Sequence, residues 1–108
     1  MAREIRESDW KVLKQLHAVA LELFCQRVLS EIEGITTDAS ITPHQRYLAV
    51  YEAVRCRDKE LANVFDNLRR STAFMQIAAL QSRGLLEKEE FLRFSDETRT
   101  LIEAYLDE

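Results

Sequence analysis

The stretch TPHQRYLAVYEAVRCRDKELANVFDNL, residues 42–68, decides the fold of this chain. It opens with Thr42 and Pro43, a pair typical of a helix start, because the hydroxyl can cap free backbone amides and proline suits the first helical position. After this start, one set of positions recurs every three or four residues, the period of one helix face. These positions are Tyr47, Tyr51, Val54, Asp58, Leu61, Phe65 and Leu68. No glycine or second proline interrupts them, so the sequence predicts one continuous helix over residues 43–67.

The composition of the whole chain agrees with long helices. The 108 residues include only two glycines and one proline. Folds made of strands and tight turns need many such residues, so their scarcity favours an all-α fold. Hydrophobic residues at 46% and charged residues at 31% are ordinary values for a globular chain, and the length fits one domain over residues 1–108.

A second long helix is expected before this stretch, over residues 9–33. Ser8 has the side chain of an N-cap, and Gly34 follows the last turn in the position where glycine often ends a helix. Between them, apolar residues again recur at helical spacing. They are Trp10, Leu13, Leu16, Ala20, Phe24 and Val28.

Three shorter helices are expected after residue 70. Ser71 and Gly84 mark the two ends of a helix over residues 72–83. Residues 85–94 form a short helix, and Ser95 caps the last one. The sequence therefore predicts a compact helical bundle of three principal helices plus two short C-terminal helices.

The helix over residues 72–83 could be a core helix or a helix that reads DNA. Its apolar residues lie nearly all round the helix, which is typical of a buried helix, and its polar residues form no basic ridge for base edges. We expect a core helix with Phe74, Ile77 and Ala78 buried.

One short phrase resembles a known motif. Residues 84–91, GLLEKEEF, resemble the Gly-Leu-Ile-Thr-x-Glu-Glu-Phe phrase of short helical-hairpin segments such as SHOCT-type motifs. The resemblance covers eight of the 108 residues. It implies a tight corner between two helices and no activity.

Several functional classes are disfavoured by charge and by missing motifs. The net charge of −4 disfavours a protein dedicated to nucleic acid, which must neutralise phosphates. No phosphate-binding loop or catalytic motif is present, so we expect no enzyme. The residue three positions before His17 or His44 is not Glu, so the Glu-x-x-His motif of helical di-metal sites is absent, and we expect no metal and no other cofactor.

Redox state and location are also expectations from the sequence. Cys25 and Cys56 have no metal-type spacing and form no Cys-x-x-Cys pair. No apolar run suits a signal peptide or a membrane span. We expect a cytoplasmic protein with two reduced thiols and no membrane contact.

Three charged residues fall on helix faces that the apolar pattern marks as inward. Arg27 and Glu31 lie four positions apart on the first long helix, and Asp58 lies at the centre of the apolar stripe of the second. Charged side chains are seldom buried without a partner. We therefore expect Asp58 to contact an arginine, with Arg27 as a candidate; the same residues could instead line a polar ligand pocket.

The start of the 72–83 helix is a second candidate site. Arg69, Arg70, Ser71 and Thr72 would bring two guanidinium groups to the unpaired amides of a helix N-terminus, an arrangement that suits an anion. The alternative is an ordinary helix cap with two solvated arginines.

The role favoured by these observations is a non-catalytic cytosolic interaction or regulatory module. Its partner is another protein or a second copy of the chain, and we expect a homodimer because two-fold dimers are the commonest soluble oligomers. The alternative is a small-ligand or anion-binding helical protein using the candidate residues above. A small nucleic-acid binder is the least favoured of the three.

Overall fold

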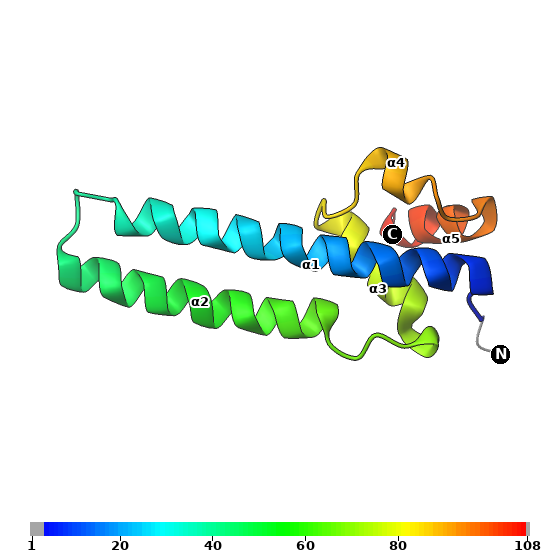
Figure 1. Ribbon diagram of the computed structural model, residues 1–108, viewed down its shortest axis with the longest axis horizontal. Helices are drawn as coiled ribbons and strands as arrows, with labels where there is room; N and C mark the ends of the chain where they lie inside the picture. Colours follow the sequence, from blue (N-terminus) through cyan, green and yellow to red (C-terminus); the bar gives the residue numbers. More distant parts are fainter. Residues whose placement is uncertain (1–3, 108) are drawn as a thin grey trace.

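The computed structural model describes residues 4–107 and confirms the all-α fold class (Figure 1). The chain is 78% helical, and its described residues contain no strand. In chain order, the elements are α1 (Glu7–Thr36), α2 (Pro43–Phe65), the 3-10 turn η1 (Arg70–Thr72), α3 (Ala73–Ser82), α4 (Lys88–Phe91) and α5 (Asp96–Leu106).

Helix α2 forms as its sequence predicts. The Thr42 side chain accepts a hydrogen bond from the backbone amide of Gln45, and the Gln45 side chain accepts one from the amide of Thr42. This reciprocal pair satisfies two amides that the helix start would otherwise leave free. The helix then runs without a break across Asp58 to Phe65.

Several predicted helix boundaries are wrong. The helix predicted over residues 85–94 is reduced to the single turn of α4, Lys88–Phe91. Ser8 is not an N-cap, because α1 already begins at Glu7 after an extended Arg6. Gly34 does not end α1, which continues to Thr36; a glycine is tolerated near an exposed helix end at a modest entropic cost. Ser71 does not cap α3, because it lies inside η1, which leads directly into that helix.

The two long helices are antiparallel, and the remaining elements cover only part of them. Figure 1 shows α3, α4 and α5 gathered around the N-terminal half of α1, while the rest of α1 and most of α2 extend away together. The molecule measures 54 × 27 × 26 Å as a result. We call residues 25–63 the arm and the rest of the described chain the head.

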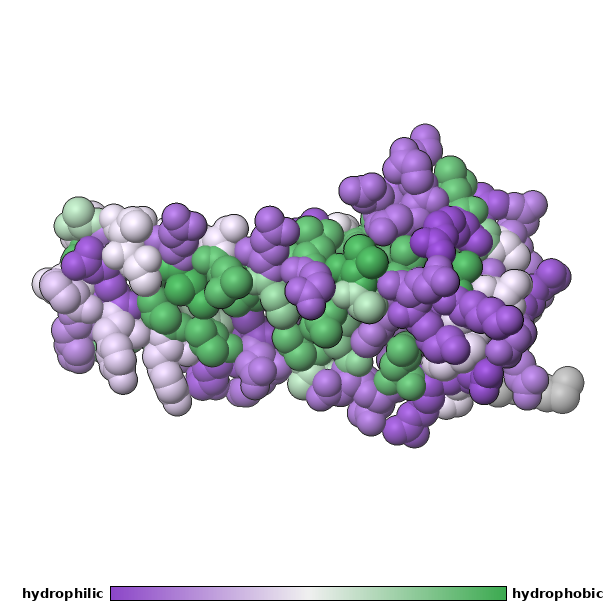
Figure 2. All heavy atoms as spheres, viewed as in Figure 1, coloured by the Kyte–Doolittle hydropathy of each residue, from purple (hydrophilic) through white to green (hydrophobic). Residues whose placement is uncertain are grey.

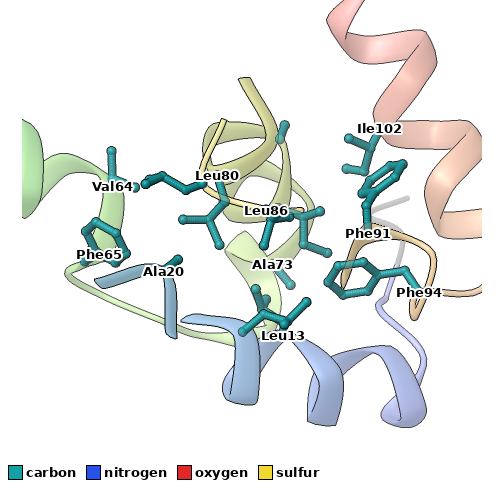
Figure 3. Close-up of a cluster of buried hydrophobic side chains, with 14 of the residues drawn as sticks. Leu13, Ala20, Val64, Phe65, Ala73, Leu80, Leu86, Phe91, Phe94 and Ile102 are labelled. Carbon is teal, nitrogen blue, oxygen red and sulfur yellow. The ribbon is translucent and has the colours of Figure 1, made fainter. Parts of the chain in front are cut away.

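The buried core lies in the head. Its side chains come from the first half of α1, the end of α2, α3 and the C-terminal elements (Figure 3). Leu13, Ile77 and Leu80 are completely buried at its centre. None of residues 25–63, all of which the structure describes, is buried. The arm therefore consists of two helices that pair with each other and have no third layer.

Helix α3 is a core helix, as predicted. Ile77 and Ala78 are buried, and Phe74 is partly buried against the same core. The helix ends at Ser82, and Gly84 follows its C-cap with a φ of 65°, a conformation that suits glycine. The amide of Leu85 donates to the carbonyl of Leu80. Leu85 and the residue after it are buried, which produces the tight corner implied by the GLLEKEEF phrase.

Candidate functional site

One side of the arm is an apolar surface. The stripe of α2 that contains Tyr47, Tyr51 and Val54 lies beside apolar residues of α1, and the two helices enclose a groove of about 300 Å³ between them. We define the apolar face by the side chains on this side of the arm. The groove itself is lined by Cys25, Leu29 and Ile32 from α1 and by Val54, Asp58 and Leu61 from α2. Tyr47 and Tyr51 belong to the face because they continue the same helical stripe of α2.

Large side chains of the apolar face are in contact with water. The exposed fractions are 66% for Leu29, 69% for Tyr47, 63% for Tyr51 and 46% for Val54. Figure 2 shows hydrophobic residues at the surface between the two helices of the arm. Single exposed apolar residues are common on proteins, whereas a gathered group of them is a feature typical of interaction surfaces.

Asp58 lies on this face and does not contact Arg27, so that prediction is wrong. Its side chain is exposed at the groove beside Val54 and Leu61, and it has no ion-pair or hydrogen-bond partner among residues 4–107. The reason is the rotation of α2 about its own axis. The side of α2 that faces α1 is turned by roughly 100°, the angle between consecutive residues, from the regular apolar stripe. Arg57, one position earlier, is the charged residue that turns toward α1.

The opposite side of the arm is charged, and Arg57 lies between the two sides, because it lines both the apolar groove and a charged hollow. The Arg57 guanidinium donates to the carboxylates of Glu31 at 3.0 Å and Glu60 at 2.9 Å, and the Arg83 side chain donates to Glu60 at 3.2 Å. Hydrogen bonds from Arg57 to Glu31 and Glu60, together with their negative charges, raise its pKa above the ordinary arginine value. These pairs link α1, α2 and the end of α3.

A hollow of about 290 Å³ opens beside these ion pairs. Arg27 also lines it, with its two terminal nitrogens donating to the backbone carbonyls of Arg83 at 3.1 Å and Gly84 at 2.8 Å. Arg27 thereby provides donors to two carbonyls of the turn that directly follows α3. The structure thus places Arg27 and Glu31 on one face, as predicted, but joins each of them to a different group.

The four residues at the start of α3 do not converge on one point. The Arg70 guanidinium contacts the Glu7 carboxylate at 3.1 Å and lies over the Trp10 ring, 5.3 Å from its centroid. Arg69 instead donates to the side chain of Asn67 at 3.2 Å. Thr72 points back to the Arg69 carbonyl, and Ser71 is exposed within η1. The two arginines are therefore held apart by separate partners.

The sequence did not reveal the most connected buried carboxylate. Asp9 is 1% exposed and accepts hydrogen bonds from the Ser95 amide at 2.8 Å, the Ser95 hydroxyl at 2.7 Å and the Thr98 hydroxyl at 2.7 Å. Burial alone would raise its pKa, but these hydrogen bonds and the nearby Arg6 charge lower it below the ordinary value. Asp9 ties the start of α1 to the start of α5, a structural role.

The described residues offer neither a metal-binding cluster nor a helix that could span a membrane. Across residues 4–107, no group of three or more His, Cys, Asp or Glu side chains is placed to hold a metal ion. His17 instead packs edge-to-face against the ring of Phe65, with its Nε2 donating to the Phe65 carbonyl at 3.0 Å. None of the helices described is both long enough and apolar enough to cross a bilayer.

Comparison of the chain with models of known protein families, with curated proteins and with solved structures found no match. The candidate site is therefore defined by geometry alone. Two surfaces of the arm compete for this role, the apolar face and the charged hollow on the opposite side.

Proposed function

We propose that this protein is a non-catalytic cytosolic interaction module, and that the apolar face of the arm is its docking surface. The observation that carries the proposal is the contrast in burial along the same two helices. Leu13 of α1 is completely buried in the head, whereas Leu29 of the same helix is 66% exposed in the arm. A partner that covers the arm would supply the missing third layer.

The physical gain from such a partner is substantial. Fully burying one large apolar side chain contributes about 1.5–3 kcal/mol, and the apolar face offers several that are now half or more exposed. The elongated groove between α1 and α2 suits an apolar helix surface, because helices pack side by side with their ridges in each other's grooves. The partner is another helical protein or a second copy of this chain.

The alternative is a small-ligand or anion site in the charged hollow. Its volume of about 290 Å³ and its lining by Arg27, Arg57 and Arg83 support this function. Arg57 and Arg83 are already paired with carboxylates, and Arg27 is bound to two carbonyls, so an anion would have to displace internal partners. The apolar face needs no such displacement and is the better supported site. For nucleic acid, the net charge of −4 remains unfavourable.

The proposal is tested by placing a charge on the apolar face. Val54→Arg alters that face, and Val19→Arg is its matched control, because Val19 is 54% exposed on α1 but lies outside the groove. Both variants should keep the circular dichroism of the natural chain. In quantitative capture from the native host's extract, Val54→Arg should lose the specific partners that Val19→Arg retains. Identical partner sets for the two variants would contradict the proposed docking surface.

A further inference from the structure

The apolar face carries its own set of hydrogen-bonding groups. Asp58 provides a carboxylate with no partner among residues 4–107, and Tyr47 and Tyr51 provide hydroxyls that are likewise unbonded within that range. A carboxylate that is covered by a partner loses its water and costs free energy unless it accepts new hydrogen bonds. Whatever covers this face must therefore bring a donor to Asp58.

The spacing of these groups along α2 is self-complementary. Tyr51 and Asp58 are seven positions apart, which places them on the same helix face and about 10 Å apart along the axis. The midpoint between them falls next to Val54. Consider two copies stacked face to face, related by a two-fold axis that lies between the faces and runs perpendicular to α2 at this point. This axis would bring Tyr51 of each copy opposite Asp58 of the other. The same operation would bring the Tyr47 ring to within one residue of the level of Leu61.

The other way of stacking two arms leaves Asp58 without a donor. A two-fold axis parallel to the helices would place α1 of the second copy over α2. Asp58 would then face the apolar side of α1, where Cys25 and Leu29 line the groove at the same level. Neither residue offers a strong hydrogen-bond donor. The hydrogen-bonding pattern therefore selects the antiparallel arrangement.

The size and accessibility of the face are also suited to a second copy. Helix α2 spans 23 residues, so two paired helices present a face of roughly 35 by 20 Å, or about 700 Å². Stable specific interfaces bury about 800 Å² on each partner. The groove of this face is lined by α1 and α2 alone, whereas Arg83 and Leu85 of the head border the opposite hollow. The head thus leaves the centre of the apolar face open.

We propose that the apolar face binds a second copy of this chain to form an antiparallel four-helix bundle. In this dimer, the Tyr51 hydroxyl of each copy donates to the Asp58 carboxylate of the other, and the two heads lie at opposite ends. Val54 lies beside the two-fold axis. The inference rests on the proposed function and names the occupant of its docking surface.

Sedimentation equilibrium of the full chain tests the dimer. The natural chain should be dimeric at tens of micromolar, Val54→Arg should be monomeric, and Val19→Arg should match the natural chain. Tyr51→Phe should weaken the dimer by roughly 100-fold or more, because it removes two symmetric hydrogen bonds to carboxylates. Tyr105→Phe is its control, since Tyr105 is 59% exposed on α5, outside the arm.

A disulfide tests the antiparallel register. In a chain carrying Cys25→Ser and Cys56→Ser, Val54→Cys should form a covalent dimer on mild oxidation, because the two thiols meet beside the axis. Val19→Cys in the same chain should not. A dimer that resists Val54→Arg, or one that gives no Val54→Cys cross-link, would overturn the proposed arrangement.

The same experiments separate this inference from the proposed function. If the natural chain stays monomeric at several hundred micromolar while Val54→Arg still removes a partner from the extract, self-pairing is wrong and the docking surface stands. If Val54→Arg changes neither sedimentation nor capture, both are wrong.

Discussion

The head and the arm are built from the same two long helices but bury their side chains to very different extents. In the head, α3 and the C-terminal elements cover α1, and Leu13 and Leu16 lose nearly all contact with water. In the arm, α1 and α2 cover only one side of each other, so Leu29 remains 66% exposed. The helical period determines which side is apolar, but neighbouring elements determine whether that side is covered. Binding of a partner is therefore most favourable at an apolar side that no neighbouring element packs against, because it buries the most exposed apolar surface there.

The largest expected effect contrasts the same substitution in the two regions. Leu13→Ala should lower the free energy of unfolding by about 3 kcal/mol, because it opens a cavity in the closed core. Leu29→Ala should change it by less than about 0.5 kcal/mol, as is usual for surface positions. Urea denaturation at concentrations where the chain is monomeric checks both. Similar decreases in the free energy of unfolding for the two variants would contradict the difference in burial between head and arm.

A smaller contrast concerns two aspartates. Asp9→Asn should cost about 2 kcal/mol, because the amide cannot accept all the hydrogen bonds that Ser95 and Thr98 donate to the buried carboxylate. Asp58→Asn should stay within about 0.5 kcal/mol in the monomer, since Asp58 is exposed. Thermal denaturation of both variants at neutral pH measures the difference. A larger loss for Asp58→Asn would show that the arm has an internal role for this residue.

The Asp9 contact also predicts a pH dependence. Its pKa is lower in the folded protein than in the unfolded chain, so its contribution to stability is present above the ordinary aspartate pKa of about 3.9. That contribution is lost as the pH falls through the lowered folded value. The stability gap between the natural chain and Asp9→Asn should therefore narrow below about pH 4. A gap that is constant from pH 7 to pH 3 would contradict this role.

The smallest contrast compares two surface arginines. Arg27→Gln should cost about 1 kcal/mol, because it removes the hydrogen bonds to the Arg83 and Gly84 carbonyls that hold the arm to the head. Arg55→Gln removes only an exposed pair with Glu52 within α2 and should cost less than about 0.5 kcal/mol. Chemical denaturation resolves this difference. Equal values would mean that the Arg27 hydrogen bonds contribute no more than a surface ion pair.

Local signals in the sequence predicted local structure well. The Thr42 cap and the unbroken period of α2 gave the correct start and continuity of that helix, because both depend on neighbours a few residues away. The start and the end of α1 were predicted wrongly at Ser8 and Gly34. Residues of these types favour helix ends, but packing and helix propagation can override that preference.

The candidate site was harder to predict because it depends on the relative rotation of helices. The period of α2 correctly grouped Val54, Asp58 and Leu61 on one face. It could not show how α2 is rotated relative to α1, and therefore could not show that Arg57, rather than Asp58, points toward α1. Asp9 was overlooked for a related reason, since Ser95 is 86 positions away in the sequence. Contacts of this kind follow from tertiary packing and leave no spacing signal.

The central claim is that the apolar face of the arm is exposed in the monomer and becomes buried when a partner binds. Amide hydrogen exchange at increasing protein concentration tests this claim most directly. In dilute solution, amides of α2 in the arm should exchange through openings of lower free energy than those of α3 in the head, because fewer buried contacts hold the arm. As the concentration rises, exchange around Tyr47–Leu61 should slow while exchange in α3 stays constant. An arm that is as protected as the head in dilute solution, and unchanged at high concentration, would contradict this account.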